Sequence, residues 1–460
     1  MRRSETIAAI ATAPGEGGIA IVRVSGSESI RIVDQYFKGK SRLSEARGYT
    51  IQHGVFCGSD KLFIDEVLAL VFRSPNSYTT EDTIEICCHG GALISQKICD
   101  ALIFGGALPA LPGEFTMRAF LGGRIDLTQA EAVCDLIKAK SDAAAQIASS
   151  HLRGGLLEEI KRLRMGLLDC ISNLEISLDF SEEDLELDED SEIIRALKSI
   201  YSTIKRLTAS YSIAKRIQIG IRVVITGRTN AGKSSLLNSI IQRNRAIVSD
   251  EPGTTRDYID ENVLLNGIQY DIYDTAGLRE SFNPIEAEGI NRTWNLISTA
   301  DLVLYVVDPS NPTQDDLENL KRIREIFDGT VLTVVNKIDL FSETQISALC
   351  QLFPNDAIPI STKFLLGLDE LKRRIDLSTW SGRKIYDGVD IVLTQERQVD
   401  CMMKSLLFIN RAIDMIKADK GKELVVFELR LAIRFLEEVV GFISDDDVLE
   451  NIFSKFCIGK

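Results

Sequence analysis

A glycine-rich segment near the middle of the chain has the residue types that bind a nucleoside triphosphate. Gly227-Arg-Thr-Asn-Ala-Gly-Lys-Ser234 follows Ile221–Thr226, an apolar run that predicts a strand, and leads into a predicted helix beginning at about Lys233. In such a loop backbone N–H groups surround the phosphates, and the helix N-terminus favours negative charge. The alternative is a chance glycine-rich turn, which the strand before it and the helix after it disfavour. We therefore predict phosphate contacts from six residues of the loop: Asn230, Ala231, Gly232, Lys233, Ser234 and Ser235.

The residue types that hold a magnesium ion recur in the expected order after this loop. The Ser234 hydroxyl is a Mg²⁺ ligand in this motif, and Lys233 reaches the β- and γ-phosphates. Thr254 and Thr255 stand where a switch-loop threonine closes over the metal. The segment Asp274-Thr275-Ala276-Gly277 follows the predicted strand Tyr270–Tyr273. Its aspartate holds Mg²⁺ through water, and the Gly277 N–H senses the γ-phosphate.

Two later segments have the residues that select the base. Asn336-Lys337-Ile-Asp339 follows the predicted strand Val331–Val335, and Ser361-Thr362-Lys363 follows Ile358–Ile360. The Asp339 carboxylate accepts hydrogen bonds from guanine N1–H and the exocyclic amine, which adenine does not match. Threonine at position 362 is a mild departure, because G domains commonly carry Ser-Ala-Lys there. The series predicts GTP as the nucleotide.

Orienting the attacking water and neutralising the charge that develops on the γ-phosphate need two further groups. Small Ras-type switches place a glutamine directly after the DxxG glycine to orient the attacking water, whereas this chain has Leu278 there. Asn230 is positioned to ligate a monovalent cation near the phosphates, and Glu286 to position the water. Asparagine also caps helices and forms turns, and Arg279 fits either the site or the surface, so the residues alone leave these roles open.

The elements around the site predict a multidomain α+β and α/β protein. Residues 1–123 alternate strands (19–24, 66–72, 83–88) with helices (27–37, 92–104). Apolar residues at steps of three and four predict helices over 156–178 and 193–211, separated by an acidic loop over 182–192. Residues 218–380 alternate strand and helix, and 381–460 return to helix. The helices of 124–217 and 381–460 are expected to pack together, which makes the α/β module an insertion in a helical domain.

Several segments closely resemble the family of bacterial tRNA modification GTPases called MnmE or TrmE. They are GRTNAGKSS, EPGTTRD, DTAGLRE and NKID in the G module, the N-terminal stretches APGEGGIAIVRVSG, SYTTEDTIEICCHGG and PGEFTMRAFLGGRIDLTQAEA, and the terminal FCIGK. The resemblance covers nearly the whole chain. It implies an N-terminal tetrahydrofolate-binding-like α+β domain that forms homodimers, a helical domain, and an inserted Ras-like P-loop G domain.

The resemblance also implies potassium-stimulated GTP hydrolysis driven by G-domain dimerisation. Lys233 and Glu286 would be catalytic, and Ser234 and Thr255 would hold Mg²⁺. The potassium ligands would be Asn230, Ser249, Glu251 and Thr254. The reaction served would be modification at C5 of the wobble uridine (position 34) of certain tRNAs to a carboxymethylaminomethyl or aminomethyl group, together with a flavin- and NADH-using partner protein.

A 5-formyl-tetrahydrofolate site would match Arg23, Glu85, Arg124 and Lys460. A carboxylate suits the amide-like face of a pterin, and cations suit the ligand's glutamate tail. Arg23 and Glu85 also fit surface positions of edge strands, and Arg124 fits an ion pair with Asp126. Many relatives have lysine in place of Arg124, which puts the geometry of that contact in doubt. Cys457 is either a reactive thiol near the folate or a small buried residue.

Composition limits the setting. The net charge is −14, so RNA would need a local patch or a partner. The 9 cysteines lack metal-type pairing, and we expect the adjacent Cys87 and Cys88 beside His89 to be structural. With no signal peptide and no apolar run of spanning length, the expectation is a cytoplasmic protein without membrane contact. A GTP-timed binding switch or ribosome-assembly GTPase is the alternative function, but it rests on the G module alone.

Overall fold

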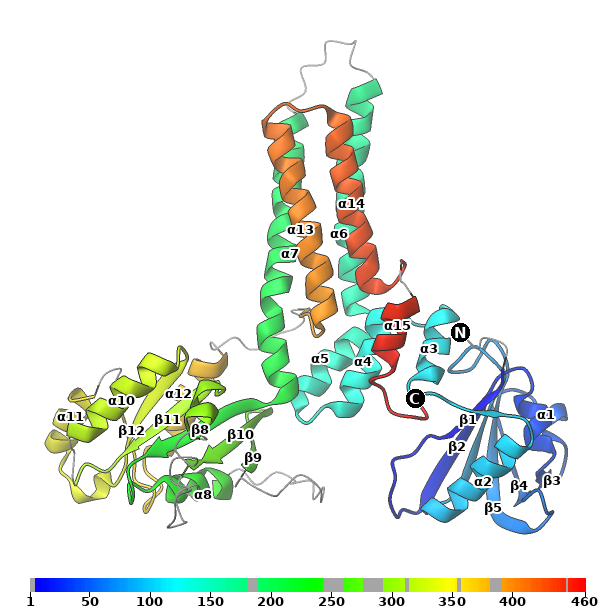
Figure 1. Cartoon of the computed structure of the whole chain (residues 1–460), viewed down its shortest axis with the longest axis horizontal. Coiled ribbons are helices and arrows are strands. Elements are labelled where there is room, and N and C mark those ends of the chain that lie inside the picture. Colours follow the sequence, from blue (N-terminus) through cyan, green and yellow to red (C-terminus); the bar gives the residue numbers. More distant parts are fainter. Residues whose placement is uncertain are drawn as a thin grey trace. The chain divides into compact units, whose positions relative to one another are not determined.

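The computed structural model describes residues 5–179, 189–243, 260–275, 293–310, 314–353, 357–380, 391–443 and 446–460. The chain divides into two compact units. The first comprises Met1–Ile137, Ser149–Lys205 and Glu396–Lys460, and the second comprises Lys138–Ala148 and Arg206–Gln395 (Figure 1). The second unit is therefore inserted between segments of the first.

The first unit begins with a seven-stranded sheet in the order β3-β4-β5-β6-β2-β1-β7. All neighbours pair antiparallel except β1 and β7. The bounds are β1 (Ile7–Ile10), β2 (Ile19–Ser25), β3 (Phe37–Gly39), β4 (Thr50–Cys57), β5 (Phe63–Phe72), β6 (Thr83–His89) and β7 (Leu108–Pro109). The helices α1 (Ser29–Asp34) and α2 (Ala92–Phe104) are packed on it.

The two faces of this sheet differ because successive side chains alternate across a strand. One face contributes Val22, Val67 and Ile86 to a buried core with residues of α1 and α2. The opposite face leaves Ile19, Ile51 and Leu68 exposed, at 68%, 63% and 42%. We call this second face the open face of the sheet.

The predicted strands in this region and the helix over 92–104 are confirmed. The helix predicted over 27–37 is wrong beyond Asp34, where α1 ends. Phe37 instead begins β3 and pairs with Phe56 in an antiparallel ladder. Burial of both rings in the core outweighs the local helical pattern.

Helices form the rest of the first unit, and α5 and α7 each have residues in both units. They are α3 (Glu114–Leu121), α4 (Leu127–Lys138), α5 (Asp142–Leu152), α6 (Gly155–Asp179), α7 (Glu189–Ile219), α13 (Glu396–Lys417), α14 (Lys422–Val440) and α15 (Asp446–Phe453). Helix α6, before the insertion, packs on α14, after it. Arg164 and Glu437 form an ion pair of 2.6 Å between them, and Glu175 and Arg430 one of 2.8 Å. The predicted packing of helices from the two sides of the insertion is confirmed.

The acidic loop predicted over 182–192 is wrong for its last four residues, because α7 already begins at Glu189. Carboxylates are stabilised at a helix N-terminus by the helix dipole, so acidic residues suit this position. Residues 182–188 lie outside the described residues.

The second unit contains a six-stranded sheet in the order β13-β12-β11-β8-β10-β9, parallel except for β9. Its strands are β8 (Ile221–Gly227), β9 (Asp260–Leu265), β10 (Ile268–Asp274), β11 (Leu302–Val307), β12 (Thr330–Val335) and β13 (Ile358–Pro359). Its helices include α8 (Lys233–Arg243), α10 (Gln314–Ile326), α11 (Glu343–Gln351) and α12 (Leu368–Trp380). Five of these strands match predicted ones, and β9 was not predicted.

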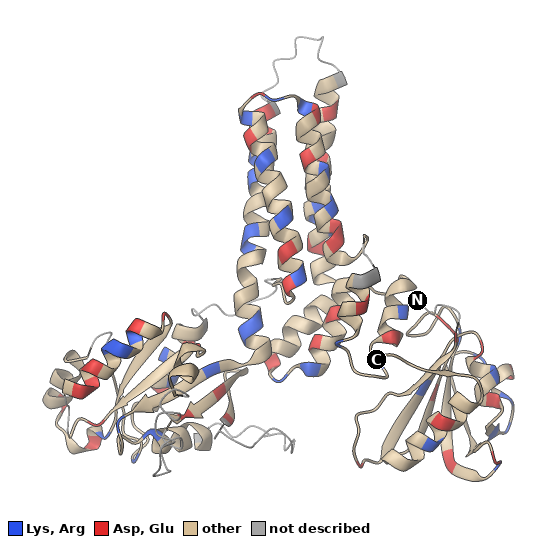
Figure 2. Ribbon diagram, viewed as in Figure 1, with Lys and Arg blue, Asp and Glu red and all other residues tan. Residues whose placement is uncertain are grey.

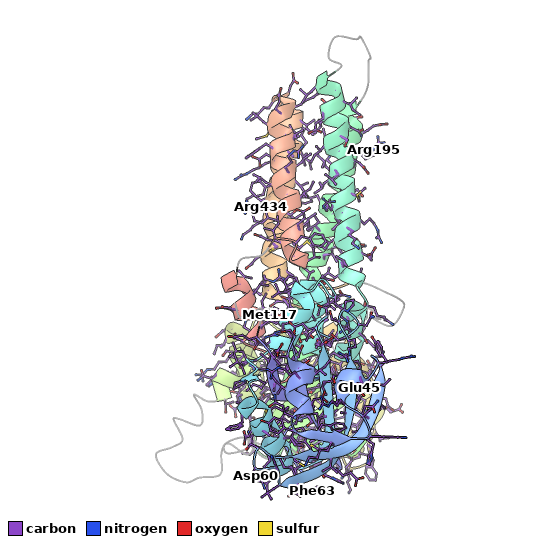
Figure 3. All side chains as sticks on the ribbon, turned by 90° about the vertical axis from the view of Figure 1, so that its right-hand side faces the viewer. Glu45, Asp60, Phe63, Met117, Arg195 and Arg434 are labelled. Carbon is purple, nitrogen blue, oxygen red and sulfur yellow. The ribbon has the colours of Figure 1, made fainter. Side chains whose placement is uncertain are left out.

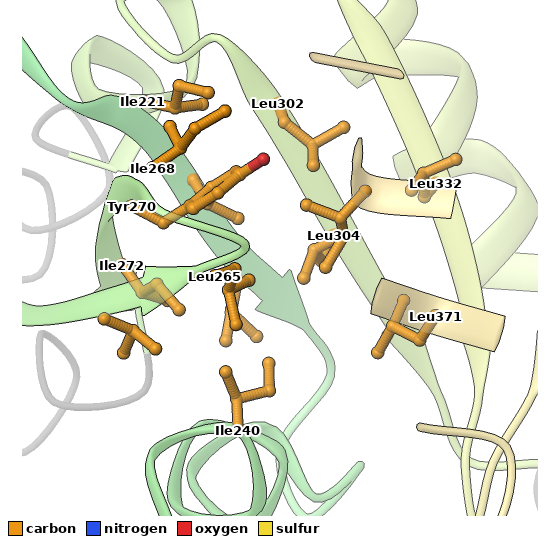
Figure 4. Packing of buried hydrophobic residues seen from close by; sticks show 14 of the residues in the cluster. Ile221, Ile240, Leu265, Ile268, Tyr270, Ile272, Leu302, Leu304, Leu332 and Leu371 are labelled. Carbon is orange, nitrogen blue, oxygen red and sulfur yellow. The ribbon is translucent and has the colours of Figure 1, made fainter. Parts of the chain in front are cut away.

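A buried cluster centred on Tyr270 fills one side of this sheet (Figure 4). The Tyr270 ring is fully buried, and its hydroxyl lies 3.1 Å from Asp376 Oδ1 and 3.0 Å from Thr379 Oγ1 on α12. Ala143, Ala144 and Ile147 of α5 belong to the same cluster. The packed sheet fixes the carboxyl ends of its parallel strands, where the predicted motifs lie.

Candidate functional site

The predicted nucleotide residues come together at one edge of the second sheet. The phosphate loop follows β8, Asp274 is the last residue of β10, and Asn336 directly follows β12. Ser361 is the second residue after β13. Carboxyl ends of neighbouring parallel strands form the crevice in which α/β proteins bind ligands.

Two glycines shape the phosphate loop. Gly227 has φ of +146° and Gly232 has φ of +95°. A Cβ on Gly227 would lie 2.2 Å from the Val306 carbonyl oxygen, and one on Gly232 would lie 2.2 Å from Asn336 Nδ2. Both positions thus require glycine, and the loop passes close to β11 and to the base-selecting segment.

Lys233 is buried at the first turn of α8. Its ammonium donates to the carbonyl oxygens of Gly227 at 3.1 Å and Arg228 at 2.7 Å. The charge is therefore held over the loop whose N–H groups are expected to bind phosphate. The 6% exposure of Lys233 excludes an ordinary solvated lysine.

Ser234, a predicted magnesium ligand, contacts Asp274, which is predicted to hold the ion through water. The Ser234 hydroxyl donates to Asp274 Oδ2 at 2.7 Å, and Asp274 is buried. A hydroxyl and a carboxylate are the hard oxygen donors that Mg²⁺ prefers, so these residues fit the ion. Thr275, next along the chain, donates to the Ile225 carbonyl oxygen at 3.0 Å and fixes the end of β10 against β8.

Asn336 connects the phosphate loop to the base-selecting segments. Its Nδ2 donates to the Ala231 carbonyl oxygen at 3.0 Å, and its Oδ1 accepts from the Thr362 N–H at 3.1 Å. The Ser361 hydroxyl donates to Asp339 Oδ1 at 2.6 Å. The orientation of the Asp339 carboxylate is thereby set by the segment that follows β13, while Lys363 is exposed.

Lys337 joins Asn230 to an aspartate that the sequence reasoning missed. Its ammonium donates to the Asn230 carbonyl oxygen at 3.0 Å and forms an ion pair with Asp308. Burial raises the pKa of the Asp308 carboxyl, but hydrogen bonds from Lys337 and Ser310 outweigh it, so this pKa lies below its usual range. Asp308 directly follows β11, and that position at the strand's carboxyl end is the signal that could have identified it.

A second missed group supports the loop at Arg228. The Arg228 guanidinium lies 3.8 Å from the buried Asp316 carboxylate, which accepts a hydrogen bond of 3.0 Å from Tyr305. Burial, followed by the nearby Asp316 charge, raises the pKa of Tyr305, so the phenol remains a donor. These residues hold the side chain of Arg228, the second residue of the phosphate loop.

Several predicted residues lie outside the described part of the chain. These are Ser249, Glu251, Thr254, Thr255, Ala276, Gly277, Leu278, Arg279 and Glu286. Of the residues predicted around potassium, only Asn230 is described. It is exposed and has a left-handed backbone conformation with φ of 64°.

The predicted folate residues of the first unit also cluster. Arg23 on β2 and Glu85 on β6 are opposite each other in the ladder and form an ion pair of 2.8 Å. Both strands are interior to the sheet, and the side chains are 14% and 17% exposed, so they are not solvated edge residues. Arg23 also donates to the Gly459 carbonyl oxygen at 3.2 Å, which brings the C-terminal segment to the pair.

Tyr78 links this pair to Arg124. The Arg23 and Arg124 guanidinium carbons lie 5.4 Å and 4.9 Å from the centre of its ring. Arg124 donates to the Tyr78 carbonyl oxygen at 2.9 Å rather than forming the alternative ion pair with Asp126. The Phe115 ring lies 5.4 Å from the Arg23 guanidinium carbon. Neither aromatic residue was predicted, because their approach depends on tertiary packing.

The terminal segment is held in place by backbone contacts. A Cβ on Gly459, which has φ of +88°, would lie 2.3 Å from the Ile10 carbonyl oxygen. The Gly113 N–H donates to the Cys457 carbonyl oxygen at 3.3 Å. Cys457 itself is exposed, not a buried core residue, and Lys460 is partly buried. Of this terminal segment, the Gly459 carbonyl oxygen is the group that contacts Arg23.

His89, beside the adjacent cysteines Cys87 and Cys88, shares a hydrogen bond of 2.7 Å with Asp65 through its Nδ1 atom.

Among the helices that the structure describes, none has the length and apolar character needed to cross a bilayer.

Two family models match the chain. One, described as GTP-binding protein TrmE N-terminus, matches residues 6–124, and the other, described as MnmE helical domain, matches residues 127–457. A relative from Syntrophotalea carbinolica named tRNA modification GTPase MnmE is 39% identical over 100% of both chains. Relatives with the same name from Bacteroides fragilis and Symbiobacterium thermophilum are 40% and 39% identical, each over 99% of both chains.

Proposed function

We propose a function from one established premise: this chain belongs to the MnmE family of tRNA modification GTPases. It is a GTP hydrolase. We propose that hydrolysis serves the modification of tRNA, at C5 of the wobble uridine, to a carboxymethylaminomethyl or aminomethyl group. The observation that carries the GTP site is that Asn336 bonds both to the phosphate loop and to Thr362, whose neighbour Ser361 bonds to the Asp339 carboxylate.

In this proposal the phosphate loop binds the triphosphate through backbone N–H groups and the ammonium of Lys233. The loop is held rigid by Asn336 and Lys337, which both donate to its carbonyl oxygens. A preorganised loop stabilises developing negative charge without reorganising during the reaction. Asp339, held by Ser361, accepts hydrogen bonds from guanine. The other residues of the proposed site are Asn230 to Ser235, Thr254, Thr255, Asp274 to Gly277, Asn336, Lys337 and Ser361 to Lys363.

Magnesium would be held by Ser234 and Thr255, with Asp274 as its second-sphere acceptor, and when bound it neutralises phosphate charge. Potassium would be held by Asn230, Ser249, Glu251 and Thr254. Glu286 would orient the attacking water, because Leu278 has no polar group to do so.

We further propose a homodimer formed through residues 1–123, with a formyl-tetrahydrofolate site at Arg23, Glu85, Arg124 and Lys460. The Arg23–Glu85 pair, partly buried beside two aromatic rings, supports binding of a flat heterocycle carrying charge. A flavin- and NADH-using protein would be the partner in the modification. Domain boundaries at residues 124, 218 and 381 belong to the same proposal.

The test of function is nucleoside analysis of tRNA from cells that lack this chain. We expect the wobble-uridine side chains to disappear and to return with the intact gene, but not with a Lys233→Ala variant. An unchanged nucleoside profile would reject the proposed role in tRNA. Co-sedimentation with ribosomal particles would then favour the alternative of a ribosome-assembly GTPase.

The potassium proposal has its own test. Replacing KCl by NaCl at equal ionic strength should lower GTP turnover sharply, because the larger ion fits the proposed oxygen ligands. Binding of a GTP analogue in the two salts serves as the control. Equal turnover rates would remove Asn230 from this role.

A further inference from the structure

Helix α7 carries a charge pattern that the nucleotide and folate sites do not use. From Ile193 to Ile219 it contains 6 Lys and Arg residues and no Asp or Glu, in a chain whose net charge is −14. Blue bands accordingly recur along α7 in Figure 2. The acidic residues of α7, Glu189, Asp190 and Glu192, are confined to its first turn, so the rest of the helix has cations as its only charged residues.

Four of these cations share one face. At 3.6 residues per turn, Arg195, Lys198, Lys205 and Arg206 fall within about 100° of one another around the helix. All four are exposed, while the opposite face buries Ile193, Ile204 and Leu207. We call these four residues the α7 stripe; Arg195 is labelled in Figure 3.

The other two cations of α7 lie further along the helix. Lys215 lies 5.6 Å from the centre of the Tyr211 ring, and Arg216 forms an ion pair of 3.1 Å with Asp301. The α7 stripe therefore ends at Arg206. It extends about 16 Å along the helix axis, at 1.5 Å per residue.

The residues between the cations indicate the kind of partner. Three small residues, Ser199, Ser202 and Ala209, are exposed on the same face. The two serines each carry a hydroxyl group. A helix that binds an anionic membrane needs large apolar residues beside its cations, and this face has none of them. Small residues let a helix approach a phosphate backbone closely, and serine hydroxyls donate to phosphate oxygens.

We propose that the α7 stripe binds the phosphate backbone of RNA. The inference rests on the proposed function for the choice of RNA as the polyanion, but not on GTP hydrolysis. It answers how an acidic chain binds a polyanion without a positive overall field: by one local surface of matching charge. Binding would be insensitive to base sequence, since phosphate contacts carry no sequence information.

The test uses the full chain and a fluorescein-labelled RNA hairpin, with affinity measured by anisotropy at several KCl concentrations. The stripe variant combines Arg195→Gln, Lys198→Gln and Arg206→Gln, and glutamine is a good helix former. A matched control combines Lys40→Gln, Lys97→Gln and Lys420→Gln, three exposed lysines outside α7. Both variants lose the same charge, so only a local effect separates them.

We expect the stripe variant to raise the Kd for the RNA at least about tenfold near 50 mM salt. Each lost phosphate contact lowers the slope of log Kd against log salt by about 0.7 to 0.9, so the three substitutions should lower it by about 2. The control should match the unaltered chain. A second variant, Ser202→Glu, adds a negative charge within the stripe and should weaken binding without removing a cation. Circular dichroism and GTP turnover should be unchanged in all three variants.

Equal RNA affinity of the stripe and control variants would overturn the inference and leave the proposed function standing. Absence of RNA binding by the unaltered chain would overturn it also, and nucleoside analysis would still test the function separately. Stripe-dependent binding to phosphatidylcholine vesicles that contain phosphatidylserine, without binding to RNA, would overturn it in favour of a membrane surface.

Discussion

At the scale of single residues, the site depends on side chains that orient one another. Asp339 is useful for base selection only because the Ser361 hydroxyl fixes its carboxylate, and Asn336 is useful because it joins the loop backbone to Thr362. Such donors and acceptors are most effective when they are held in place before the ligand arrives.

Asp339→Asn should change the preferred base. An amide donates where the carboxylate accepted, so it opposes the guanine exocyclic amine and matches the carbonyl that xanthine has at that position. Loss of one charge-assisted hydrogen bond costs about 1.5–3 kcal/mol, or about 10- to 150-fold in GTP affinity. Calorimetry with GTP and XTP measures the change. The exposed Asp328→Asn is the matched control, and retained GTP affinity in Asp339→Asn would contradict the assignment.

The cysteines should differ widely in reactivity. Burial, followed by nearby carboxylates, raises the pKa of Cys88, Cys99 and Cys170 to about 11. At pH 8 only about one in a thousand of those thiols is the reactive thiolate. Cys457 is exposed and lacks this burial. Iodoacetamide followed by peptide mass spectrometry should find Cys457 alkylated first, and raising the pH toward 11 should accelerate the buried three. Equal rates at pH 8 would refute this ordering.

At the scale of elements, long helices with regular apolar spacing were predictable. Strands whose pattern is interrupted by polar residues or glycine were not. The helices α6, α7, α13 and α14 follow from apolar spacing, because each buries one face. Strand β9 was missed because Asp260, Glu261 and Asn262 obscure its pattern. Strand β4 was missed because Gly54 interrupts it. That glycine is required there, since a Cβ would lie 2.6 Å from the Lys38 carbonyl oxygen.

The same distinction holds for the sites. The spacing of Gly227, Lys233, Asp274, Asn336 and Asp339 sufficed to predict that they meet, because each follows a parallel strand and such strands end at one edge. Tyr78 and Asp316 could not be predicted this way. Their roles arise from distances between segments that the chain brings together only on folding.

Gly232→Ala should disrupt the phosphate loop as an element. The new Cβ would lie 2.2 Å from Asn336 Nδ2 at a φ of +95°, so the backbone or Asn336 must move. We expect about 1–3 kcal/mol lower unfolding free energy from the strained conformation, and weaker GTP binding, because the bond from Asn336 to Ala231 is lost.

Urea unfolding and nucleotide titration measure the two effects of Gly232→Ala. Gly123→Ala is the control, because Gly123 has φ of +72° but no atom within 4 Å of a Cβ. This control measures the cost of placing alanine at a positive φ without the steric clash of the new Cβ. Similar GTP affinity in the two variants would show that the contact with Asn336 is unimportant.

At the scale of the whole molecule, the open face of the first sheet combines two features of the proposal. The Arg23–Glu85 pair lies on it, as do Ile19, Ile51 and Leu68, because these residues alternate with the buried ones along their strands. Large apolar side chains grouped on an uncovered face are typical of a protein interface. The sheet thus offers a surface for the proposed homodimer next to the proposed folate site.

Ile51→Asp should convert a dimer to a monomer. Ile51 lies opposite Leu70 in the β4–β5 ladder and is 63% exposed, so the substitution is tolerated in the separated chain. In a dimer formed by this face the new carboxylate is buried against its symmetry mate or against apolar side chains, and an unpaired buried charge costs several kcal/mol. Sedimentation velocity measures the shift in mass. Leu93→Asp, at a 67% exposed position on α2, adds the same charge away from the open face and should leave the dimer intact. If both variants sediment alike, whether as dimers or as monomers, the open face is not the interface.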